Sequence, residues 1–271
     1  MAYGTIIMND DQFRRLLDIL GLSWQGYRRV RKGIKKRLVR YIHCAACGSV
    51  NEYLERVASL PEVMQEARIL MTVSISHFFR DRSLWRALEE AVIPEILSVA
   101  PDRVKVWSAG CALGQEVYSF KIIWELIGSR GGSLPALFLL ATDVNPEYLR
   151  RARAGIYDAG AVKGLAADIR DTWFTRTEDR YSVSAQLKDG VSWERYDLSD
   201  PVPRSDEFHI IFLRNNLLTY YTQAIQEAAF PKIMGTLVRG GYVVIGDHER
   251  LPSTYGDLTR SDSHPCIFRK S

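Results

Sequence analysis

The chain has 271 residues, of which 46% are hydrophobic and 25% are charged, and its formal net charge is +4. This composition is ordinary for a globular protein, and the length allows one large domain with a smaller second one. It excludes a membrane-spanning helix, because no apolar run approaches the roughly 18 residues that such a helix needs. The N-terminal residues do not form an export signal, and the four cysteines suit a reducing compartment. Cys44 and Cys47 form a C-x-x-C, but no second Cys/His pair at zinc spacing accompanies it. We therefore expect a cytoplasmic protein without a metal site.

The first part of the chain is predicted to be an N-terminal helical domain, residues 1–75. Apolar residues recur there at steps of three and four, and Pro61 separates the last two helical patterns. The predicted helices cover residues 10–20, 26–42, 50–60 and 62–70. A linker and connecting helix are expected over 76–103, with a helical pattern at 83–97 that continues through or kinks at Pro94.

The second predicted helix carries an uneven charge. No Asp or Glu occurs between Leu20 and Val50, while the apolar face of the helix is opposed by a strip of cations. The cations are Arg28, Arg29, Arg31, Lys32, Lys35, Lys36, Arg37 and Arg40. Such a strip is often only a solvated surface, but one without carboxylates favours an acidic partner surface or a phosphate backbone.

From residue 104 onward strand and helix patterns alternate, which predicts an α/β domain over 104–271 with a largely parallel sheet. The predicted strands are 104–107, 137–141, 192–196, 210–213, 242–245 and 267–269. The predicted helices are 115–127, 146–154, 162–172 and 224–238. A small β insertion is expected at about 174–191, in which 181–183 and 186–187 form a hairpin.

Gly110 and Gly114 lie in the turn between the first predicted strand and its helix. Missing side chains at such a turn let a nucleotide-like ligand approach backbone amides. The spacing is not the G-x-G-x-x-G of dinucleotide sites, and no Lys-Ser/Thr pair follows for a P-loop. Two glycines alone would equally suit close packing, so the next strand decides between these interpretations.

Asp143 follows the apolar run 137–141, the second predicted strand. In doubly wound sheets, a carboxylate at the end of the second strand accepts hydrogen bonds from ribose hydroxyls. The alternative is a cap for the helix that begins at Pro146, and the two roles are compatible. Together with the glycine turn, Asp143 predicts a ligand that contains a nucleoside.

Five longer segments occur in a specific order. They are ISHFFRD at 75–81, WSAGCALGQEVYS at 107–119, LATDVNPEYLRRARAGIY at 140–157, FHIIFLRNNLLTYY at 208–221 and GGYVVIGDHERLP at 240–252. In this order the chain resembles the CheR-type methyltransferases. The resemblance implies a Rossmann-like class I methyltransferase sheet. It also implies S-adenosylmethionine as cofactor, S-adenosylhomocysteine as product, and methylation of glutamates on bacterial chemoreceptors.

The resemblance also implies roles for single residues. Arg80 and Tyr220 are expected at the transferring methyl group, with Tyr220 preferred over Thr219 although the segment before it is one residue longer than usual. Glu116 is expected to receive the ammonium group of the cofactor, and Asp143 to hold its ribose. The expected cofactor-binding residues, completed by Gly114 from the glycine turn, are Ser76, Arg80, Gly110, Gly114, Glu116, Asp143, Asp197, Leu198, Arg214 and Asn215.

The sequence departs from the family pattern at several points. Gln115 and Val117 replace a Glu and a Pro, and Asp197 replaces an Asn. The segment 174–197 is shorter than in members whose hairpin docks onto the C-terminal peptide of a receptor. These departures indicate a divergent member, whose methyl acceptor the sequence leaves open.

The chemistry can be argued from the side chains. A glutamate carboxylate with a pKa near 4 is ionised at pH 7, so methyl transfer to it needs no general base. It needs groups that position it, and Arg80 can bind a carboxylate in bidentate fashion while Tyr220 can donate a hydrogen bond. The alternative for Arg80 is that it pairs with Asp81 or caps the helix of Ser83. The alternative for Tyr220 is a core position beside Tyr221.

Four functions remain open at this point. The first is methylation of a glutamate on an acidic helical protein, such as the cytoplasmic domain of a chemoreceptor. The others are methylation of a small molecule, an inactive cofactor-binding regulator, and a nucleic-acid methyltransferase. The last is disfavoured because the chain lacks the Asn/Asp-Pro-Pro-aromatic signature of base methylation. In the first function, the expected substrate-binding cations are Arg31, Lys35, Lys36 and Arg40.

Overall fold

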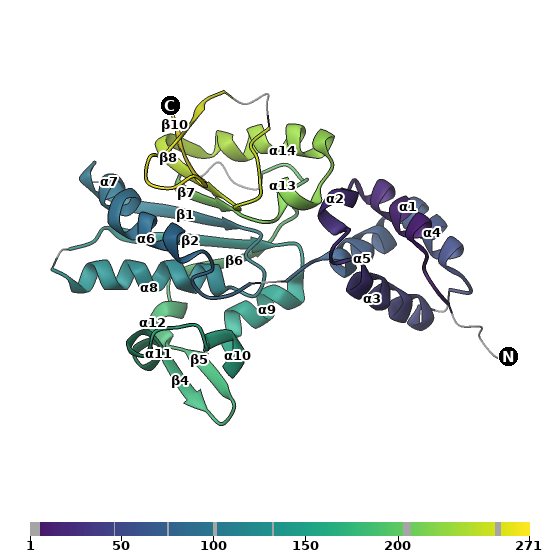
Figure 1. Ribbon diagram of the computed structural model, residues 1–271, viewed down its shortest axis with the longest axis horizontal. Coiled ribbons are helices and arrows are strands. Elements are labelled where there is room, and N and C mark those ends of the chain that lie inside the picture. The colour runs from purple at the N-terminus through teal and green to yellow at the C-terminus, as the bar shows by residue number, and fades with distance from the viewer. Residues whose placement is uncertain are drawn as a thin grey trace. The chain divides into compact units, whose positions relative to one another are not determined.

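The computed structural model describes residues 6–45, 47–74, 76–99, 102–131, 133–202, 207–252 and 256–271. The chain divides into two compact units. The colours of Figure 1 follow the residue number, so the segments of each unit can be traced there. A helical unit comprises Met1–Val73 together with Asn215–Ala228, and an α/β unit comprises Ser74–Arg214 together with Ala229–Ser271. The sequence placed all of 104–271 in one domain, whereas the segment Asn215–Ala228 groups with the helical unit.

The helical unit has a core of interlocking apolar faces, in which Phe13, Leu38 and Tyr53 are fully buried. Its N-terminal helices are α1 (Asp10–Leu20), α2 (Trp24–Tyr27), α3 (Arg31–Cys44), α4 (Val50–Ser59) and α5 (Pro61–Met71). Asn9 begins α1 with a reciprocal capping box to Gln12, which satisfies two amides of the first turn. The predicted helices 10–20, 50–60 and 62–70 are confirmed, with each end correct to within one residue.

The predicted helix 26–42 is wrong at one place, because a turn separates α2 from α3. The Arg31 side chain donates to the carbonyl oxygen of Arg28, the acceptor that a continuous helix would give to the amide of Lys32. The Tyr27 hydroxyl donates to the carbonyl oxygen of Met71 at 3.1 Å, which anchors the end of α2 in the core.

The segment Asn215–Ala228 is bound to the N-terminal helices by backbone contacts. It includes α13 (Leu217–Tyr220) and the start of α14 (Gln223–Gly235). The amide of Ser23 donates to the carbonyl oxygen of Tyr220 at 2.8 Å, and the amide of Thr222 donates to that of Gly21 at 3.0 Å. A Cβ atom at Gly26 would lie 2.2 Å from the carbonyl oxygen of Thr219, so this contact requires glycine.

The α/β unit is built on a seven-stranded sheet in the order β6-β2-β1-β7-β8-β10-β9. Its first five strands in this order are parallel, while β10 is antiparallel to both β8 and β9. The strands are β1 (Arg103–Ala109), β2 (Ala136–Asp143), β6 (Val191–Arg195), β7 (Phe208–Leu213), β8 (Leu237–Ile245), β9 (Leu258–Arg260) and β10 (Ile267–Lys270). The mostly parallel α/β sheet predicted from the sequence is confirmed, and β9 is an addition to it.

The helices of the α/β unit lie beside this sheet or around a second, smaller sheet, and Figure 1 shows α8 running along one face of the seven-stranded sheet. They are α6 (Arg82–Ala87), a π-helical turn (Leu88–Val92), α7 (Ile93–Ser98), α8 (Gln115–Ser129), α9 (Pro146–Ala154), α10 (Ala159–Val162), α11 (Ala167–Trp173) and α12 (Ala185–Lys188). The π-helical turn ends at Val92 and α7 follows at once with Pro94 in its first turn, so the predicted helix 83–97 continues through the proline.

Two predicted helices of this unit need correction. The pattern 162–172 is two short helices, and Arg82 donates to the carbonyl oxygen of Gly164 in the break between them. The predicted helix 224–238 is too long, because α14 ends at Gly235 and Val238 lies in β8. The Lys270 ammonium donates to the carbonyl oxygens of Met234 and Leu237, which satisfies acceptors where the helix stops.

A second, smaller sheet has the order β3-β5-β4 and is antiparallel throughout. Its strands are β3 (Ile156–Asp158), β4 (Phe174–Thr177) and β5 (Arg180–Val183). The predicted pairing of 181–183 with 186–187 is wrong, because Gln186 and Leu187 lie in α12 and Leu187 is fully buried. The turn from β4 to β5 contains Glu178 at φ 53°, a conformation that glycine or asparagine usually signals.

Candidate active site

The parallel register brings the carboxyl ends of the central strands to one edge of the sheet. Ala109 of β1 lies beside Thr142 of β2, so the glycine turn begins next to Asp143. The amides of Gly110 and Cys111 both donate to the carbonyl oxygen of Thr142 at 2.8 Å. This edge is where open α/β sheets bind their ligands.

Gly110 and Gly114 both need the conformational freedom of glycine, with φ angles of 90° and 86°. A Cβ atom at Gly114 would lie 3.0 Å from the Cβ of Ala152 and 3.1 Å from the ring of Trp193. Gly114 precedes the first turn of α8, and no side chain caps that turn. Gly114 is therefore needed partly for close packing. The backbone amides at the start of α8 have no side-chain acceptor, so they can donate to a ligand.

Asp143 is 7% exposed, and backbone amides hold both of its oxygens. Asn145 donates to Oδ1 and Ala112 donates to Oδ2, each at 2.9 Å. Each oxygen keeps a lone pair for a further donor. Burial raises the pKa of Asp143 to about 6. Hydrogen bonds from the amides of Asn145, Ala112 and Val144 oppose this rise, and the Asp197 carboxylate adds to it.

Asp143 does not cap the helix that follows it. The cap of α9 is Asn145, whose side-chain oxygen accepts from the amides of Glu147 and Tyr148. The capping alternative from the sequence is therefore wrong, and Asp143 is instead a buried carboxylate at the end of β2.

Arg214, at the end of β7, joins two carboxylates of the α/β unit. Its guanidinium donates to Asp81, and its Nη1 lies 3.3 Å from Oε2 of Glu116. The other oxygen of Glu116 accepts from the Ser108 hydroxyl at 2.7 Å. The Arg214 side chain is only 4% exposed, and its Nε has no hydrogen-bond partner in the part of the chain that the structure describes.

Arg80 lies between two residues with unusual backbone conformations. Phe79 and Asp81 have φ angles of 48° and 63°, a backbone conformation that residues other than glycine seldom adopt. The amide of Phe79 donates to the Ser119 hydroxyl at 2.9 Å, and the Trp85 indole donates to the carbonyl oxygen of Arg80 at 2.7 Å. These bonds hold the strained segment, which is typical of a functional site.

Asp197 and Leu198 follow β6, the strand next to β2, and are 5% and 3% exposed. The amide and hydroxyl of Ser199 both donate to Oδ1 of Asp197, at 2.9 and 2.7 Å. The amide of Tyr196 donates to the carbonyl oxygen of Asp143, so the ends of β6 and β2 are tied together. Ser76 is half-buried within the same unit.

Tyr220 and Asn215 belong to the helical unit rather than to the α/β unit. The ring of Tyr220 lies 4.9 Å from the ring of Tyr27, centroid to centroid, and Tyr220 packs half-buried against the helical core. Asn215 has a φ angle of 53° where the chain leaves β7. The structure thus brings most of the predicted cofactor-binding residues to the carboxyl ends of the strands, whereas Asn215 and Tyr220 belong to the other unit.

Sequence reasoning missed three polar residues at this edge. Ser108 and Asp81 bind the ionised groups of Glu116 and Arg214, and both lie inside quoted motifs that give no direct signal of the pairing. Gln115 is 3% exposed, and its Oε1 has no hydrogen-bond partner among the described residues. A buried acceptor without a donor indicates that a ligand or water completes this place.

The basic strip on the helical unit is partly neutralised. Asp10 of α1 lies 3.3 Å from Nε of Arg31 and 2.8 Å from Nζ of Lys35. The hydrogen bond from Lys35 lowers the pKa of Asp10 most, and the hydrogen bond from Arg31 lowers it further. Lys36 and Arg40 are exposed, and no described carboxylate pairs with them. The expectation of a strip without carboxylates is therefore wrong for Arg31 and Lys35.

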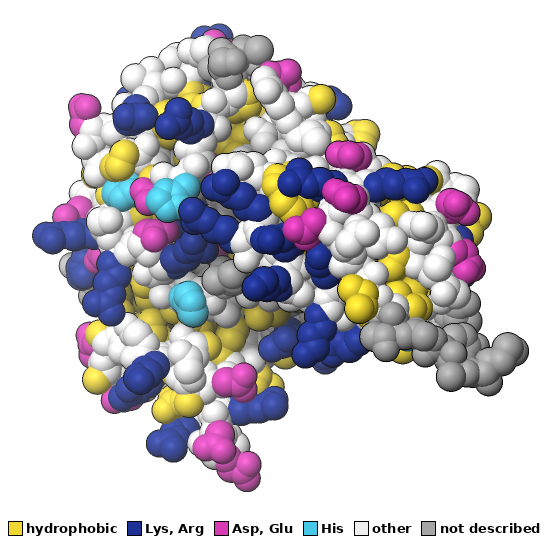
Figure 2. All heavy atoms as spheres, turned by 45° about the vertical axis from the view of Figure 1, so that its right-hand side comes forward, with side chains coloured by type: hydrophobic (Ala, Val, Ile, Leu, Met, Phe, Trp, Pro, Cys, Tyr) yellow, Lys and Arg dark blue, Asp and Glu magenta, His cyan; other side chains and the backbone are white. Residues whose placement is uncertain are grey.

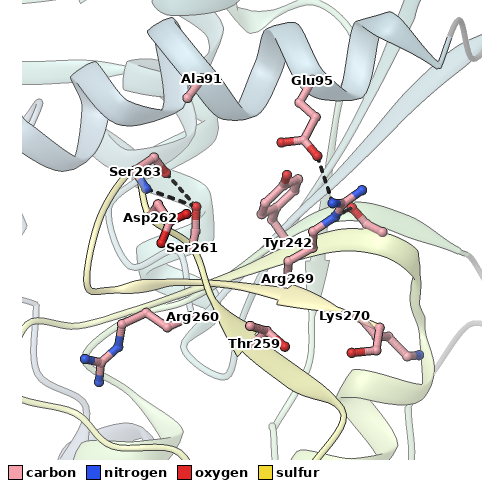
Figure 3. Close-up of a pocket in the computed structure, with 12 residues that line it drawn as sticks. Ala91, Glu95, Tyr242, Thr259, Arg260, Ser261, Asp262, Ser263, Arg269 and Lys270 are labelled. Atoms are coloured by element: carbon pink, nitrogen blue, oxygen red, sulfur yellow. Dashed lines mark hydrogen bonds and ion pairs between the residues drawn. The ribbon is translucent and has the colours of Figure 1, made fainter.

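Charge of both signs is also present elsewhere on the surface. On the face drawn in Figure 2, Lys and Arg side chains gather in patches with Asp and Glu side chains between them. A hollow of about 680 Å³ lies between α7 and the strands β8, β10 and β9. There Arg269 pairs with Glu95 at 3.0 Å beside Tyr242, as Figure 3 shows. None of the predicted site residues lines this hollow.

No helix in the described ranges is long and apolar enough to cross a membrane. No cluster of three or more His, Cys, Asp or Glu side chains in those ranges could hold a metal ion.

Known proteins show where this chain belongs. The family described as CheR methyltransferase, SAM binding domain, matches residues 74–266. A chemotaxis protein methyltransferase of Listeria monocytogenes is 30% identical over 89% of each chain. One from Vibrio parahaemolyticus is 32% identical over 74% of this chain and 73% of its own.

Among solved structures, a TehB-like SAM-dependent methyltransferase from Corynebacterium glutamicum is 18% identical over 70% of this chain and 96% of its own, with a TM-score of 0.40. At that similarity, the fold is assigned from the strand order of this chain and from the family match. The strand order agrees with the expected Rossmann-like class I methyltransferase sheet. The family match agrees with S-adenosylmethionine as the cofactor. The chain belongs to the CheR family of S-adenosylmethionine-dependent methyltransferases.

Proposed function

We propose that this methyltransferase acts in the cytoplasm and methylates a glutamate side chain on an acidic helical protein, such as the cytoplasmic domain of a chemoreceptor. The observation that carries the proposal is the exposed part of α3. Lys36 and Arg40 have no carboxylate partner among the described residues, so their charge is available to an acidic surface. The names of the chemotaxis relatives support the same class of acceptor.

The residues at the sheet edge fit the cofactor. The two free lone pairs of Asp143 match the two donors of a ribose diol. Glu116 supplies a carboxylate for an ammonium group, and the orphaned Oε1 of Gln115 is a further acceptor in the same turn of α8. Asp197 and Leu198 at the end of β6 are proposed to hold the adenine, with Ser76, Arg214 and Asn215 completing the set.

In this proposal the protein supplies position rather than acid–base chemistry. Bound S-adenosylmethionine supplies a methyl group on a positively charged sulfur. The acceptor glutamate is ionised near pH 7, so no residue has to remove a proton from it. Arg80 holds the acceptor carboxylate by charge-assisted hydrogen bonds, and Tyr220 donates a further one. Alignment and exclusion of water then account for the rate.

The geometry around Arg80 supports its role in positioning. The residues on either side of it are held in conformations that side chains rarely adopt, and two hydrogen bonds fix them. Such a cost of about 1–3 kcal/mol per residue persists only where the surroundings enforce it. A guanidinium on a fixed segment loses less entropy when it binds a carboxylate.

The experiment is a transfer assay with S-adenosylmethionine labelled in its methyl group. The acceptor is a purified receptor cytoplasmic fragment, and a matched fragment carries Gln in place of the acceptor glutamates. We expect label on the first fragment only, and its release as methanol in mild alkali, because a methyl ester is alkali-labile whereas methyl on nitrogen is not. Alkali-stable label, or label only in small molecules of a cell extract, contradicts the proposal and favours the small-molecule alternative.

A further inference from the structure

A second pocket of the α/β unit lies away from the glycine turn. It has a volume of about 500 Å³, within the range of small-molecule sites. Phe79 and Trp85 contribute aromatic rings in edge-to-face contact, with centroids 5.8 Å apart. Ile123 and Leu126 of α8 form another wall, two to three helical turns beyond Gly114. The interior of the pocket is therefore mainly apolar.

The rim of this pocket is positively charged. Arg82, Arg86 and Lys163 line it, together with the single acid Glu89. Glu89 is neutralised from outside the pocket by Arg130 at 2.8 Å, and Arg86 pairs with Glu90 at 2.8 Å.

The charges of two of these cations are not compensated by a carboxylate. Arg82 donates to a backbone carbonyl oxygen, that of Gly164, which is neutral. Across the described chain no carboxylate pairs with Arg82 or Lys163, and both are exposed. The pocket thus has an apolar interior with two uncompensated cations at its mouth.

The hollow in Figure 3 differs in this respect. Arg269 forms an ion pair there with Glu95, and the Lys270 ammonium donates hydrogen bonds to backbone carbonyl oxygens. Arg260 and Asp262 also line the hollow, and no ion pair joins either of them to another described residue. The hollow thus carries unpaired charges of both signs, whereas the two unpaired charges at the pocket beside Trp85 are both positive.

We propose that the pocket beside Trp85 binds a small amphiphilic anion, a carboxylate joined to an aromatic or aliphatic body of roughly ten carbons. The apolar body fills the space between Trp85 and α8, and the carboxylate meets Arg82 and Lys163 at the rim. This site is separate from the proposed cofactor and acceptor residues and goes beyond the proposed methyl transfer. The position of the pocket matters, because the Trp85 indole donates to the carbonyl oxygen of Arg80 and Phe79 directly precedes Arg80 in the chain.

The test uses the full chain and a matched pair of probes. The probes are 4-phenylbutyrate and 4-phenylbutanamide, which have the same shape and differ in charge. Binding is followed by NMR through the indole N–H signal of Trp85, assigned with Trp85→Phe. We expect a saturable shift with 4-phenylbutyrate and a dissociation constant on the order of a millimolar, as suits a ligand of this size. The neutral amide should bind three- to tenfold more weakly.

Charge reversal at the rim gives the second measurement. The double variant Arg82→Glu, Lys163→Glu should weaken 4-phenylbutyrate by about three- to tenfold, as for exposed ion pairs, and leave the amide within about twofold. Lys232→Glu, an exposed cation on α14, is the matched control and should change neither probe. Two results would each overturn the proposal: no saturable shift at Trp85 with 4-phenylbutyrate, or equal affinity for acid and amide on the wild-type protein. The second comparison needs no variant to fold.

Discussion

The Arg214 guanidinium lies 3.3 Å from the Glu116 carboxylate, although the two residues are 98 positions apart in the sequence. Because Arg214 also donates to Asp81, one cation serves two anions in a place where its side chain is 4% exposed. If Glu116 turns to an ammonium group of the cofactor, Asp81 still compensates the charge of Arg214. Asp81 thus makes Glu116 available without leaving a buried charge unpaired.

This relationship predicts the effect of Asp81→Asn. The variant should weaken S-adenosylhomocysteine binding by about three- to tenfold, because Glu116 must then remain with Arg214. The free energy of unfolding should fall by about 1 kcal/mol, since the Asp81 side chain is 39% exposed and solvent screens part of the pair. Calorimetry and urea unfolding measure the two effects. The control is Asp171→Asn, in an exposed ion pair with Arg170, and equal affinities in the two variants contradict the role of Asp81.

Asp143→Ala should have the larger effect on the cofactor. Losing a carboxylate that receives ribose hydroxyls should cost about 2 kcal/mol, or roughly 30-fold in affinity for S-adenosylhomocysteine. The matched control is Asp257→Ala, which removes an exposed carboxylate of the same unit. Titration calorimetry at pH 8 decides the matter, and unchanged affinity in Asp143→Ala would remove this residue from the site.

The raised pKa of Asp143 predicts a pH dependence with a definite sign. Burial favours the neutral acid, so the carboxyl takes up its proton below pH 6 in the folded protein and only below about 3.8 when unfolded. Its contribution to stability is therefore present at low pH and lost as the pH rises from about 4 to 6, by an amount on the order of 3 kcal/mol. Compared at pH 4 and pH 7, Asp143→Ala should gain stability relative to the wild type at the higher pH. A difference independent of pH contradicts the shift.

Affinity for the cofactor product should follow the same titration in the opposite direction. The ionised carboxylate accepts from both ribose hydroxyls, and protonation removes one acceptor. S-adenosylhomocysteine should bind less tightly at pH 5 than at pH 7.5, and Asp143→Ala should lose most of this dependence.

How much the sequence could predict is clear from individual residues. Asp143 and the glycine turn were found because a parallel sheet places the ends of β1 and β2 together, whatever the side chains elsewhere. Helix α1 was correct from end to end, since Asn9 and Gly21 mark its limits by their own conformations. Local signals of this kind need no knowledge of distant contacts.

Other features depend on contacts between distant segments. Asp81 and Arg214 are 133 positions apart, and no spacing rule pairs them. Asp10 neutralises cations of α3 from another helix, so the charge of that strip cannot be judged from α3 alone. The segment of Tyr220 groups with the N-terminal helices through backbone hydrogen bonds, which leave no pattern in the side chains.

Arg80→Ala and Tyr220→Phe should separate positioning from cofactor binding. Both side chains are proposed to act on the acceptor, so turnover should fall at least tenfold while the dissociation constant for S-adenosylhomocysteine changes less than about threefold. Tyr220→Phe keeps the ring that packs on Tyr27, so its fold should persist. Tyr221→Phe is the matched control. If either variant keeps near wild-type turnover with an acceptor that the wild-type enzyme methylates, the substituted residue is structural.

The last prediction concerns α3 and compares two pairs of cations on the same helix. Lys36→Glu, Arg40→Glu reverses exposed, unpaired charges, and should lower kcat/KM for an acidic protein acceptor while leaving the fold intact. Arg31→Glu, Lys35→Glu instead places two carboxylates beside Asp10, so it should mainly lower stability.

The two variants and the wild type are measured at low and high salt, with Lys232→Glu as control. Contacts made through exposed charges are screened over about 8–10 Å, so added salt should lower wild-type kcat/KM and have little effect on the Lys36→Glu, Arg40→Glu variant. Cofactor affinity should be the same in both. For an enzyme that methylates a small molecule, kcat/KM should not depend on the charges of Lys36 and Arg40. Activity that neither salt nor reversal of Lys36 and Arg40 changes would therefore contradict an acidic protein acceptor, and would leave this face of α3 as an ordinary solvated surface.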